Sequence, residues 1–464
     1  MDAVVSVFPS RNYKPQTTRS WDFMRFPHIV KRNRAVESDV VIGFIDTGIW
    51  PESDSFSDGG FSRPSKKWKG ACNGGQNFTC NNKIIGARFY SSNTRENSAR
   101  DTNGDGTHVA STAAGNKIHG TSFYGMAKGN ARGAVPSARI AVYKVFWKGG
   151  CSSVDILAAF DDAINDQVDI ISFSLGGIMA KGYKSDVIAI GSFHAMRRGI
   201  LTSSAAGNAG PYPNSVTNVA PWMLTVEAST MDRKFIDEVI LGDGTTLKPD
   251  ITATGTDILA AWSPLNSPSG IPGDTRSVKY NIISGTSMAF PHATGAAAYV
   301  KTFHPNWSPA AIKSNLMTTA SAMNDTKNPD GEFSYGSGHL NPAKAINPGL
   351  IYDAHEDDYL MMLCHLGDSH EVLAMTDYEK RCPKKFPRAA RDLNYPSMAS
   401  DLRETHFIRT VTNIGSANSI YIATVSSNYD VNITVSPEIL CFKSFKEETN
   451  FRCCSQGDRG KKYG

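Results

Sequence analysis

The stretch VVIGFID, residues 40–46, is apolar up to its final aspartate and decides the fold of the first part of the chain. Similar apolar runs follow, and segments with helical periodicity separate them. The runs are ARIAVYKV, VDIISFSL and GILTSSAA, and the helical segments include SSVDILAAFDDAINDQ and residues 185–198. Strands that are apolar on both faces and alternate with helices are typical of a covered parallel sheet. The sequence therefore predicts an α/β domain with a doubly wound parallel sheet.

The pattern changes further along the chain. Two more helices are expected at about residues 286–303 and 308–320, where alanine-rich stretches end at proline or polar turns. Past about Leu393 the sequence alternates between apolar and polar residues, as in HFIRTVTNIGSANSIYIATV, which favours a small antiparallel β-sandwich. Residues 446–464 are charged and carry two adjacent cysteines. We expect no element of the sandwich there.

Composition excludes several classes of protein. The net charge of +4 on 464 residues is mild, and no basic stripe with interleaved aromatic residues occurs, so no nucleic-acid partner is expected. No apolar run reaches the ~18 residues that a membrane-spanning helix needs, so no membrane contact is expected either. The first residues, MDAVVSVFPS, lack the pattern of a signal peptide.

Cysteines and possible glycosylation sites favour an oxidising compartment. Cys72 and Cys80 bracket one short polar loop, and Cys364 and Cys382 bracket another. Because no closely spaced set of four zinc ligands exists, we expect these pairs to form disulfides and expect no metal site. The sequence N-x-S/T, the acceptor for N-glycosylation, occurs at Asn77, Asn306, Asn324 and Asn432.

Polar residues that could carry chemistry lie at the ends of these elements. In a doubly wound sheet, functional groups gather beyond the carboxyl ends of the strands. Asp46 ends the first strand, Asn208 follows the strand GILTSSAAG, and Ser287 lies in the first turn of a helix, where free N–H groups favour an anion. Taken singly, these could be a turn aspartate, a turn asparagine and a helix cap. Together they suggest a catalytic site.

The segment DTNGDGTHVA, residues 101–110, offers a histidine for that site and also a rival interpretation. Asp101, Asn103 and Asp105 match the start of an EF-hand calcium loop, but its last ligand should be a glutamate and is Thr112 here. We therefore favour His108 as part of a catalytic set. An aspartic protease would need a second Asp-Thr/Ser-Gly besides residues 46–48, and an α/β-hydrolase would need G-x-S-x-G around its serine. Neither motif occurs.

These motifs resemble those of subtilisin-like serine proteases, most closely the plant, cucumisin-like branch. The resemblance is carried by VVIGFIDTGIWPES, DGTHVAST, SAAGNAGP and GTSMAFPHATG and extends through most of residues 2–445. The chain order Asp, His, Ser is also that of subtilisin. The resemblance implies a secreted serine endopeptidase that hydrolyses protein or peptide substrates without a cofactor.

The resemblance also implies roles for particular residues. Ser287 would be the nucleophile, His108 the general base and Asp46 the residue that orients the imidazole. Asn208 would donate a hydrogen bond to the oxyanion. Within FSLGG, residues 173–177, Ser174, Leu175 and Gly176 would bind the backbone of an extended peptide and line the first specificity pocket, although a plain buried strand would have a similar sequence.

The chain departs from this family at one position inside the site. The family usually has a histidine where Asp105 lies, three residues before His108. A carboxylate there is expected to raise the pKa of His108 and to shift activity to higher pH.

Other departures concern missing segments. The family carries a protease-associated domain and part of the catalytic core where Leu247 here adjoins Lys248. We assign residues 1–16 to the last strand of an inhibitory propeptide, residues 17–360 to the catalytic domain and residues 361–392 to a linker. Residues 393–445 would form a truncated fibronectin-III-like sandwich, and residues 446–464 an unrelated tail. Loss of core strand could prevent folding. The alternative to a protease is therefore an inactive or non-folding fragment that at most binds peptides.

Overall fold

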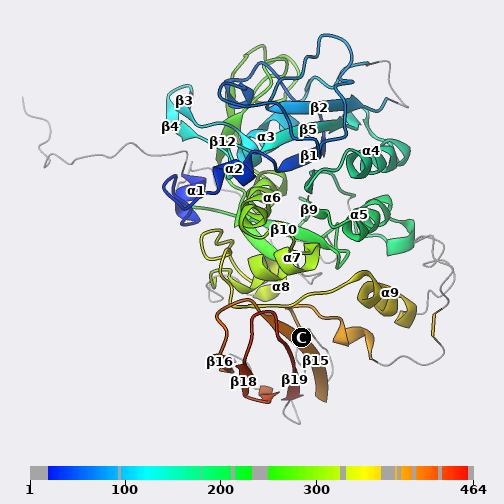
Figure 1. Ribbon diagram of the computed structural model, residues 1–464. Helices are drawn as coiled ribbons and strands as arrows, with labels where there is room; N and C mark the ends of the chain where they lie inside the picture. The colour runs from blue at the N-terminus through cyan, green and yellow to red at the C-terminus, as the bar shows by residue number, and fades with distance from the viewer. Residues whose placement is uncertain are drawn as a thin grey trace, which may run out of the picture.

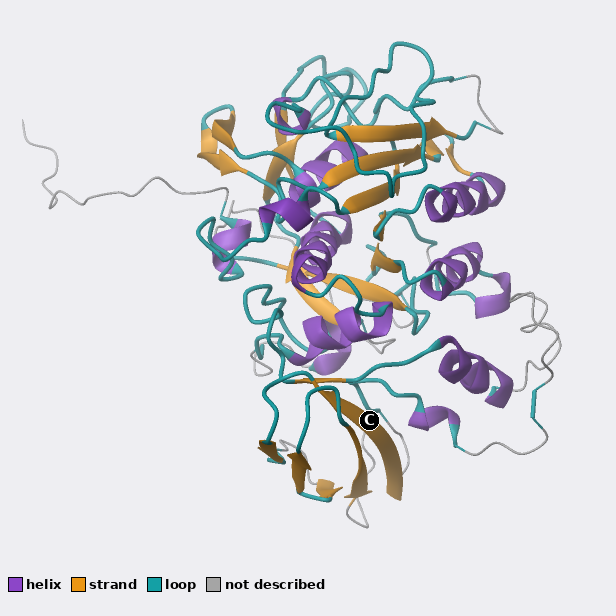
Figure 2. Ribbon diagram, viewed as in Figure 1, coloured by secondary structure: helices purple, strands orange, loops and turns teal. Residues whose placement is uncertain are grey.

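The computed structural model describes residues 19–91, 96–177, 179–210, 215–232, 249–323, 331–366, 382–383, 388–399, 404–426 and 431–457. The propeptide remnant at residues 1–16 and the junction at residues 247–248 lie outside these ranges. Figure 1 shows helices around a central sheet in one body and the strands from β15 onward in a second, smaller body. Figure 2 shows that the helices gather in the first of these bodies.

A parallel sheet forms the centre of the larger body. Its strand order is β11-β10-β9-β8-β1-β5-β2, and each neighbouring pair of strands is parallel. The order reverses direction at β1, as doubly wound sheets do. The strands are β1 (Val41–Asp46), β2 (Ile84–Phe89), β5 (Arg139–Lys144), β8 (Ile170–Phe173), β9 (Leu201–Ala205), β10 (Met223–Ser229) and β11 (Ile251–Thr254). The predicted fold class is confirmed.

Helices cover both faces of this sheet. On one face, α6 packs against α3 and against strands β8 to β11, and on the other face α4 and α5 pack together. Helices α4, α5 and α6 were expected from the sequence, with shifts of a few residues at some ends. The main helices are α3 (Asp105–Ala114), α4 (Ser153–Asn165), α5 (Val187–Arg197), α6 (Thr286–Phe303), α7 (Pro309–Thr318) and α9 (Glu356–His365). Short helices are α1 (Ser20–Phe23), α2 (Arg34–Glu37) and α8 (Glu332–Tyr335).

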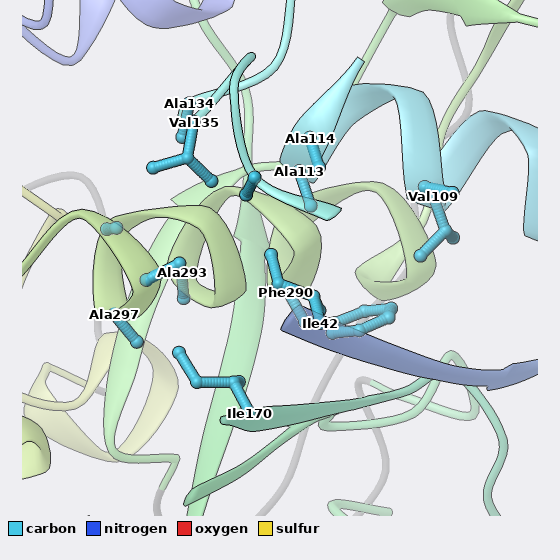
Figure 3. Close-up of a cluster of buried hydrophobic side chains, with 14 of the residues drawn as sticks. Ile42, Val109, Ala113, Ala114, Ala134, Val135, Ile170, Phe290, Ala293 and Ala297 are labelled. Carbon is cyan, nitrogen blue, oxygen red and sulfur yellow. The ribbon is translucent and has the colours of Figure 1, made fainter. Parts of the chain in front are cut away.

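Strand β1 contributes to two hydrophobic cores because successive side chains of a strand point to opposite faces. Ile42 and Phe44 belong to the core under α3 and α6, whereas Val41 and Ile45 belong to the core under α4 and α5. Figure 3 shows the first core, in which small residues of α3 and α6 such as Ala113 and Ala293 let the two helices approach closely. This close packing fixes the start of α3 relative to the start of α6.

Three pairs of antiparallel strands lie outside the central sheet in this body. They are β3 (Ile118–Phe123) with β4 (Met126–Ala131), β6 (Phe146–Trp147) with β7 (Gly150–Cys151), and β12 (Ile258–Ala261) with β13 (Tyr280–Ile283). Strand β12 packs against α3 and therefore lies close to the predicted site.

The smaller body is a β-sandwich that includes the segment we had assigned to an unrelated tail. One sheet has the order β14-β15-β19-β17, and the other pairs β16 with β18. The strands are β14 (Leu350–Ile351), β15 (Glu404–Asn413), β16 (Ser419–Ile422), β17 (Val431–Ser436), β18 (Ile439–Phe442) and β19 (Glu448–Gly457). The prediction for residues 446–464 was therefore wrong, since β19 pairs with a strand on each side. Its alternation is hidden because Phe451 is its only large apolar residue.

The predicted linker also needs correction. Helix α9 crosses the expected boundary at residues 360 and 361, and Tyr359, Leu360 and Leu363 pack into the core under α5. Most of residues 367–387 lie outside the described ranges. None of the described helices is long and apolar enough to cross a membrane.

Candidate active site

Ser287 lies in the first turn of α6, as expected, and lines a cleft of about 330 Å³. The residue before the helix is Gly285, whose φ of 151° favours glycine. A side chain at Gly285 would also approach Asn208 Nδ2 to 3.3 Å. The first N–H groups of a helix have no partner within the helix, so this end of α6 favours negative charge.

Asn208 lies after β9 and is held by the same helix. Its Oδ1 accepts hydrogen bonds from the Thr286 N–H and from Thr286 Oγ1, each at 2.9 Å. A backbone N–H can only donate, so the amide oxygen must face Thr286 and the amide Nδ2 is left as a donor. The orientation of Asn208 is therefore fixed by Thr286, a residue that the sequence did not single out.

Ser174, Leu175 and Gly176 follow β8 and line the same cleft as Ser287 and Asn208. The loop is tied to the sheet by Asn218, whose Nδ2 donates to Leu175 O at 2.9 Å and to Ala205 O at 2.8 Å. Five of the residues that the sequence placed in the site thus meet in one cleft. Asn218 was not expected, because nothing in the sequence distinguishes it from an ordinary turn asparagine.

Asp46 lies at the end of β1 and is 1% exposed. Its Oδ1 accepts from the Thr47 N–H at 2.6 Å, while Oδ2 is buried and has no hydrogen-bond partner among the described residues. Burial and the nearby Asp105 carboxylate raise the pKa of Asp46 well above its ordinary value. Among the described residues, the hydroxyl of Ser174 donates a hydrogen bond to the neighbouring Asp105 carboxyl.

His108 does not lie where the predicted general base should lie. It is fully buried on the second turn of α3, and its Nε2 is 2.9 Å from Ile258 O in β12. Because a carbonyl oxygen only accepts, Nε2 carries the hydrogen, and Nδ1 has no partner among the described residues. Neither Asp46 nor Ser287 is a hydrogen-bond partner of His108. The assignment of His108 as general base is contradicted.

Asp105 lies in the cleft instead. It is the first residue of α3 and lines the cleft together with Ser174 and Ser287. Its Oδ2 is 3.2 Å from Ser174 Oγ, which is 3.0 Å from Ser287 Oγ. Burial and the Asp101 carboxylate raise the pKa of Asp105 to about 6. No histidine is among the described residues that line the cleft.

The expected rise in the pKa of His108 is also contradicted. Burial lowers the pKa of His108 to about 4, so the imidazole is neutral at physiological pH. The two residues are three positions apart on α3, a separation of nearly one turn, which corresponds to a rise of ~4.5 Å. Because of this rise, Asp105 lines the cleft, whereas His108 lies under β12.

The aspartate that begins the segment DTNG has a structural role. Asp101 is fully buried, and its Oδ1 accepts from Thr47 Oγ1 and from the N–H groups of Asn103 and Gly104 at 2.7–3.0 Å. Its Oδ2 accepts from the N–H and hydroxyl of Thr107. These bonds fix the start of α3 against β1, and the described residues contain no cluster with the makeup of a metal site.

Both predicted disulfides are present. Cys72 bonds to Cys80 and Cys364 to Cys382, with Cα–Cα distances of 6.0 and 5.6 Å. Three of the possible glycosylation sites, Asn77, Asn306 and Asn432, are exposed, whereas Asn324 lies outside the described residues.

Comparisons with known proteins identify both bodies. Residues 37–338 match the Subtilase family, and residues 392–462 match a fibronectin type-III domain. The latter match includes β19, in agreement with the corrected boundary. A solved structure, fervidolysin from Fervidobacterium pennivorans, is similar at 19% identity and a TM-score of 0.47, over 67% of this chain and 43% of that one.

Two plant proteins show how much of the family architecture is present. The chain is 43% identical to subtilisin-like protease SBT4.8 of Arabidopsis thaliana and 42% identical to SBT4.3 of the same plant. The alignments cover 98% and 97% of this chain and 82% of each relative. The first spans 588 positions, whereas this chain has 464 residues, so at least 124 positions have no counterpart here. The chain therefore belongs to the subtilase family, as a plant-type subtilisin-like serine protease with a fibronectin type-III domain and a shortened sequence.

Proposed function

We propose that the chain binds peptides in an extended conformation in the cleft and acts on them through Ser287 as a serine endopeptidase of low intrinsic rate. Ser174, Leu175 and Gly176 would hold the substrate backbone, and Asn208 Nδ2 would donate to the oxyanion. The observation that carries this proposal is the set of hydrogen bonds around Ser287. Ser174 Oγ contacts both Ser287 Oγ and the carboxyl group of Asp105, so Asp105 takes the place of a general base near the serine.

The low rate follows from the missing imidazole. Position 105 is adjacent to Asp46 and linked through Ser174 to Ser287, so the histidine usual in the family at this position would have an acid on one side and the serine on the other. General acid–base catalysis by a positioned side chain contributes ~10²–10⁴-fold to a rate. A chain with aspartate at position 105 should lose much of that factor.

Binding without efficient turnover is the second candidate function. It is supported by the same feature, because the residues that would hold a peptide line the cleft and no histidine is among the described residues that line it. In this form the chain would bind peptides in the cleft without cleaving them efficiently. The two candidates differ only in how fast Ser287 reacts.

We also propose that the protein is secreted and glycosylated. The two disulfides and the exposed Asn77, Asn306 and Asn432 support an oxidising compartment. In this proposal, an inhibitory propeptide would assist folding, as it does in the subtilase family.

The test compares four proteins: the wild type, Asp105→His, Ser287→Ala and the double variant. Each is first checked for cooperative thermal unfolding, so that a failure to fold is recognised. Labelling by a fluorophosphonate probe then measures the reactivity of the serine, and fluorescence polarisation of a labelled peptide library on Ser287→Ala measures binding.

We expect Asp105→His to label ~10²–10⁴-fold faster than the wild type, and the double variant not to label. We also expect Ser287→Ala to bind peptides. A folded Asp105→His protein that labels no faster than the wild type would contradict the role assigned to position 105. A folded Ser287→Ala protein that binds no peptide would contradict the function of the cleft.

A further inference from the structure

A chain of hydrogen bonds links Ser287 to the half-buried carboxyl group of Asp105. Ser174 Oγ lies 3.0 Å from Ser287 Oγ and 3.2 Å from Asp105 Oδ2, and all three residues line the cleft. They come from three separate elements, since Asp105 starts α3, Ser174 follows β8 and Ser287 lies in the first turn of α6. The packing of α6 against both α3 and β8 holds them in place.

The direction of these hydrogen bonds depends on the charge of Asp105. A serine hydroxyl has one hydrogen, so Ser174 can donate to only one of its two neighbours. An ionised carboxylate only accepts, and therefore takes the hydrogen of Ser174. The free lone pairs of Ser174 Oγ can then accept the hydrogen of Ser287. In the protonated state Asp105 can itself donate to Ser174, and the pull on the hydrogen of Ser287 is lost.

We propose that Asp105 is a positioning residue that draws the proton of Ser287 through Ser174, so that its ionisation sets the remaining nucleophilicity of Ser287. This proposal rests on the proposed function and specifies how the serine reacts without an imidazole. With a fluorophosphonate, the Ser287 Oγ–P bond forms, the P–F bond breaks and fluoride leaves. The proton of Ser287 passes to Ser174, and that of Ser174 to Asp105.

The surroundings of Asp105 support a transition in the neutral range. Asp101 before α3 opposes its ionisation, and Asp46 at the end of β1, whose own pKa is raised by Asp105, is the other neighbouring carboxyl group. Ser174 and Ser287 are the groups that face it across the cleft from β8 and α6.

Two further titratable groups near Asp105 are engaged elsewhere. Lys144 of β5 interacts with Asp101, and its Nζ donates to Arg100 O at 2.6 Å. His108, on the same helix, is neutral near pH 6 and bonded to β12. The raised pKa of Asp105, about 6, agrees with this arrangement.

The experiment measures the second-order rate of fluorophosphonate labelling between pH 5 and 8. The wild type should accelerate ~10-fold between pH 5 and 7, with a midpoint near 6, and then reach a plateau. Attack assisted by hydroxide would instead keep rising with pH. Asp105→Asn should label slowly and without the midpoint, although its side chain has the same shape.

A second pair of variants tests the relay through Ser174. Ser174→Ala should lose the midpoint, whereas Ser174→Thr, which keeps the hydroxyl, should retain it. A plateau of the same height and midpoint in Asp105→Asn or in Ser174→Ala would overturn the proposal. Slow labelling of the wild type without a midpoint near pH 6 would overturn the relay and leave the proposed function standing. Absence of labelling in the wild type at every pH, with labelling of Asp105→His, would overturn the relay and leave only the second candidate function, peptide binding. Loss of peptide binding to folded Ser287→Ala would instead overturn the proposed function.

Discussion

The two sides of the cleft differ in how completely their polar atoms are paired. On the side of α6, Thr286 orients Asn208 by two hydrogen bonds, and Ser287 has Ser174 as a partner. On the side of β1 and α3, Asp46 Oδ2 and His108 Nδ1 are buried without a partner among the described residues. A buried polar atom left unpaired costs ~1–3 kcal/mol. The side that holds Ser287 is therefore better paired, while the side of β1 and α3 bears the cost of unpaired buried atoms.

The largest expected effect comes from a substitution on the α6 side of the cleft, where the polar atoms are paired. In the Asp105→His background, Asn208→Ala should slow fluorophosphonate labelling by ~10²–10³-fold, a magnitude that comes from subtilisin itself. The reason is that Nδ2 of Asn208 is the donor that Thr286 leaves available. Asn103→Ala is a suitable control, because Asn103 also lines the cleft but its side chain accepts from the Asp105 N–H at 3.3 Å. Equal rates for both variants would refute the role of Asn208.

A second prediction concerns stability on the unpaired side. The folded state raises the pKa of Asp105 from 3.8 to about 6, so between these values the folded chain keeps a proton that the unfolded chain has released. Stability from this group is therefore complete below pH 3.8 and is lost as pH rises through 6. Asp105→Asn should become more stable relative to wild type across this range, by up to about 3 kcal/mol.

Urea unfolding of both proteins at pH 4, 5, 6 and 7 checks this prediction. The buried histidines His108 and His292, whose pKa values are lowered, act in the opposite direction. They are common to both proteins and cancel in the difference between them. A difference that stays constant from pH 4 to 7 would mean that Asp105 ionises normally in the folded chain.

The smallest expected effect compares a paired and an unpaired buried hydroxyl group within one strand. Thr254 and Thr252 of β11 are both buried, but Thr252 Oγ1 donates to Tyr335 O at 3.1 Å, whereas Thr254 Oγ1 has no partner among the described residues. Thr254→Val should stabilise the protein by about 1 kcal/mol, and Thr252→Val should destabilise it by about as much. Denaturant unfolding measures both, and a change of the same sign in the two variants would contradict the interpretation.

Much of the fold could be predicted from the sequence because the parallel sheet has strong local signals. Strands such as VIGFID are apolar at every position, and helices such as α6 begin and end close to where the pattern placed them. Strand β19 was missed because one face of its sheet is exposed, so only alternate residues need to be apolar. In β19 the inward positions include Thr449 and Cys453, which do not stand out.

The site was predicted in part for a related reason. Residues at strand and helix ends, such as Ser287 and Asn208, could be placed because sheet topology brings those ends together. The choice between positions 105 and 108 could not be made in this way, since it depends on which turn of α3 faces the cleft. That depends on Asp101, whose hydrogen bonds with Thr47 and Thr107 set where the helix starts.

The central claim is that position 105, and not His108, faces the serine. The most direct test is the labelling rate of Asp105→His/His108→Gln relative to Asp105→His, measured per folded molecule. Glutamine can keep a hydrogen bond to Ile258 O, so the fold around β12 should persist. We predict that the two rates are equal. A fall of ~10²–10⁴-fold, the contribution of a general base, would show that His108 is the base and would contradict the account.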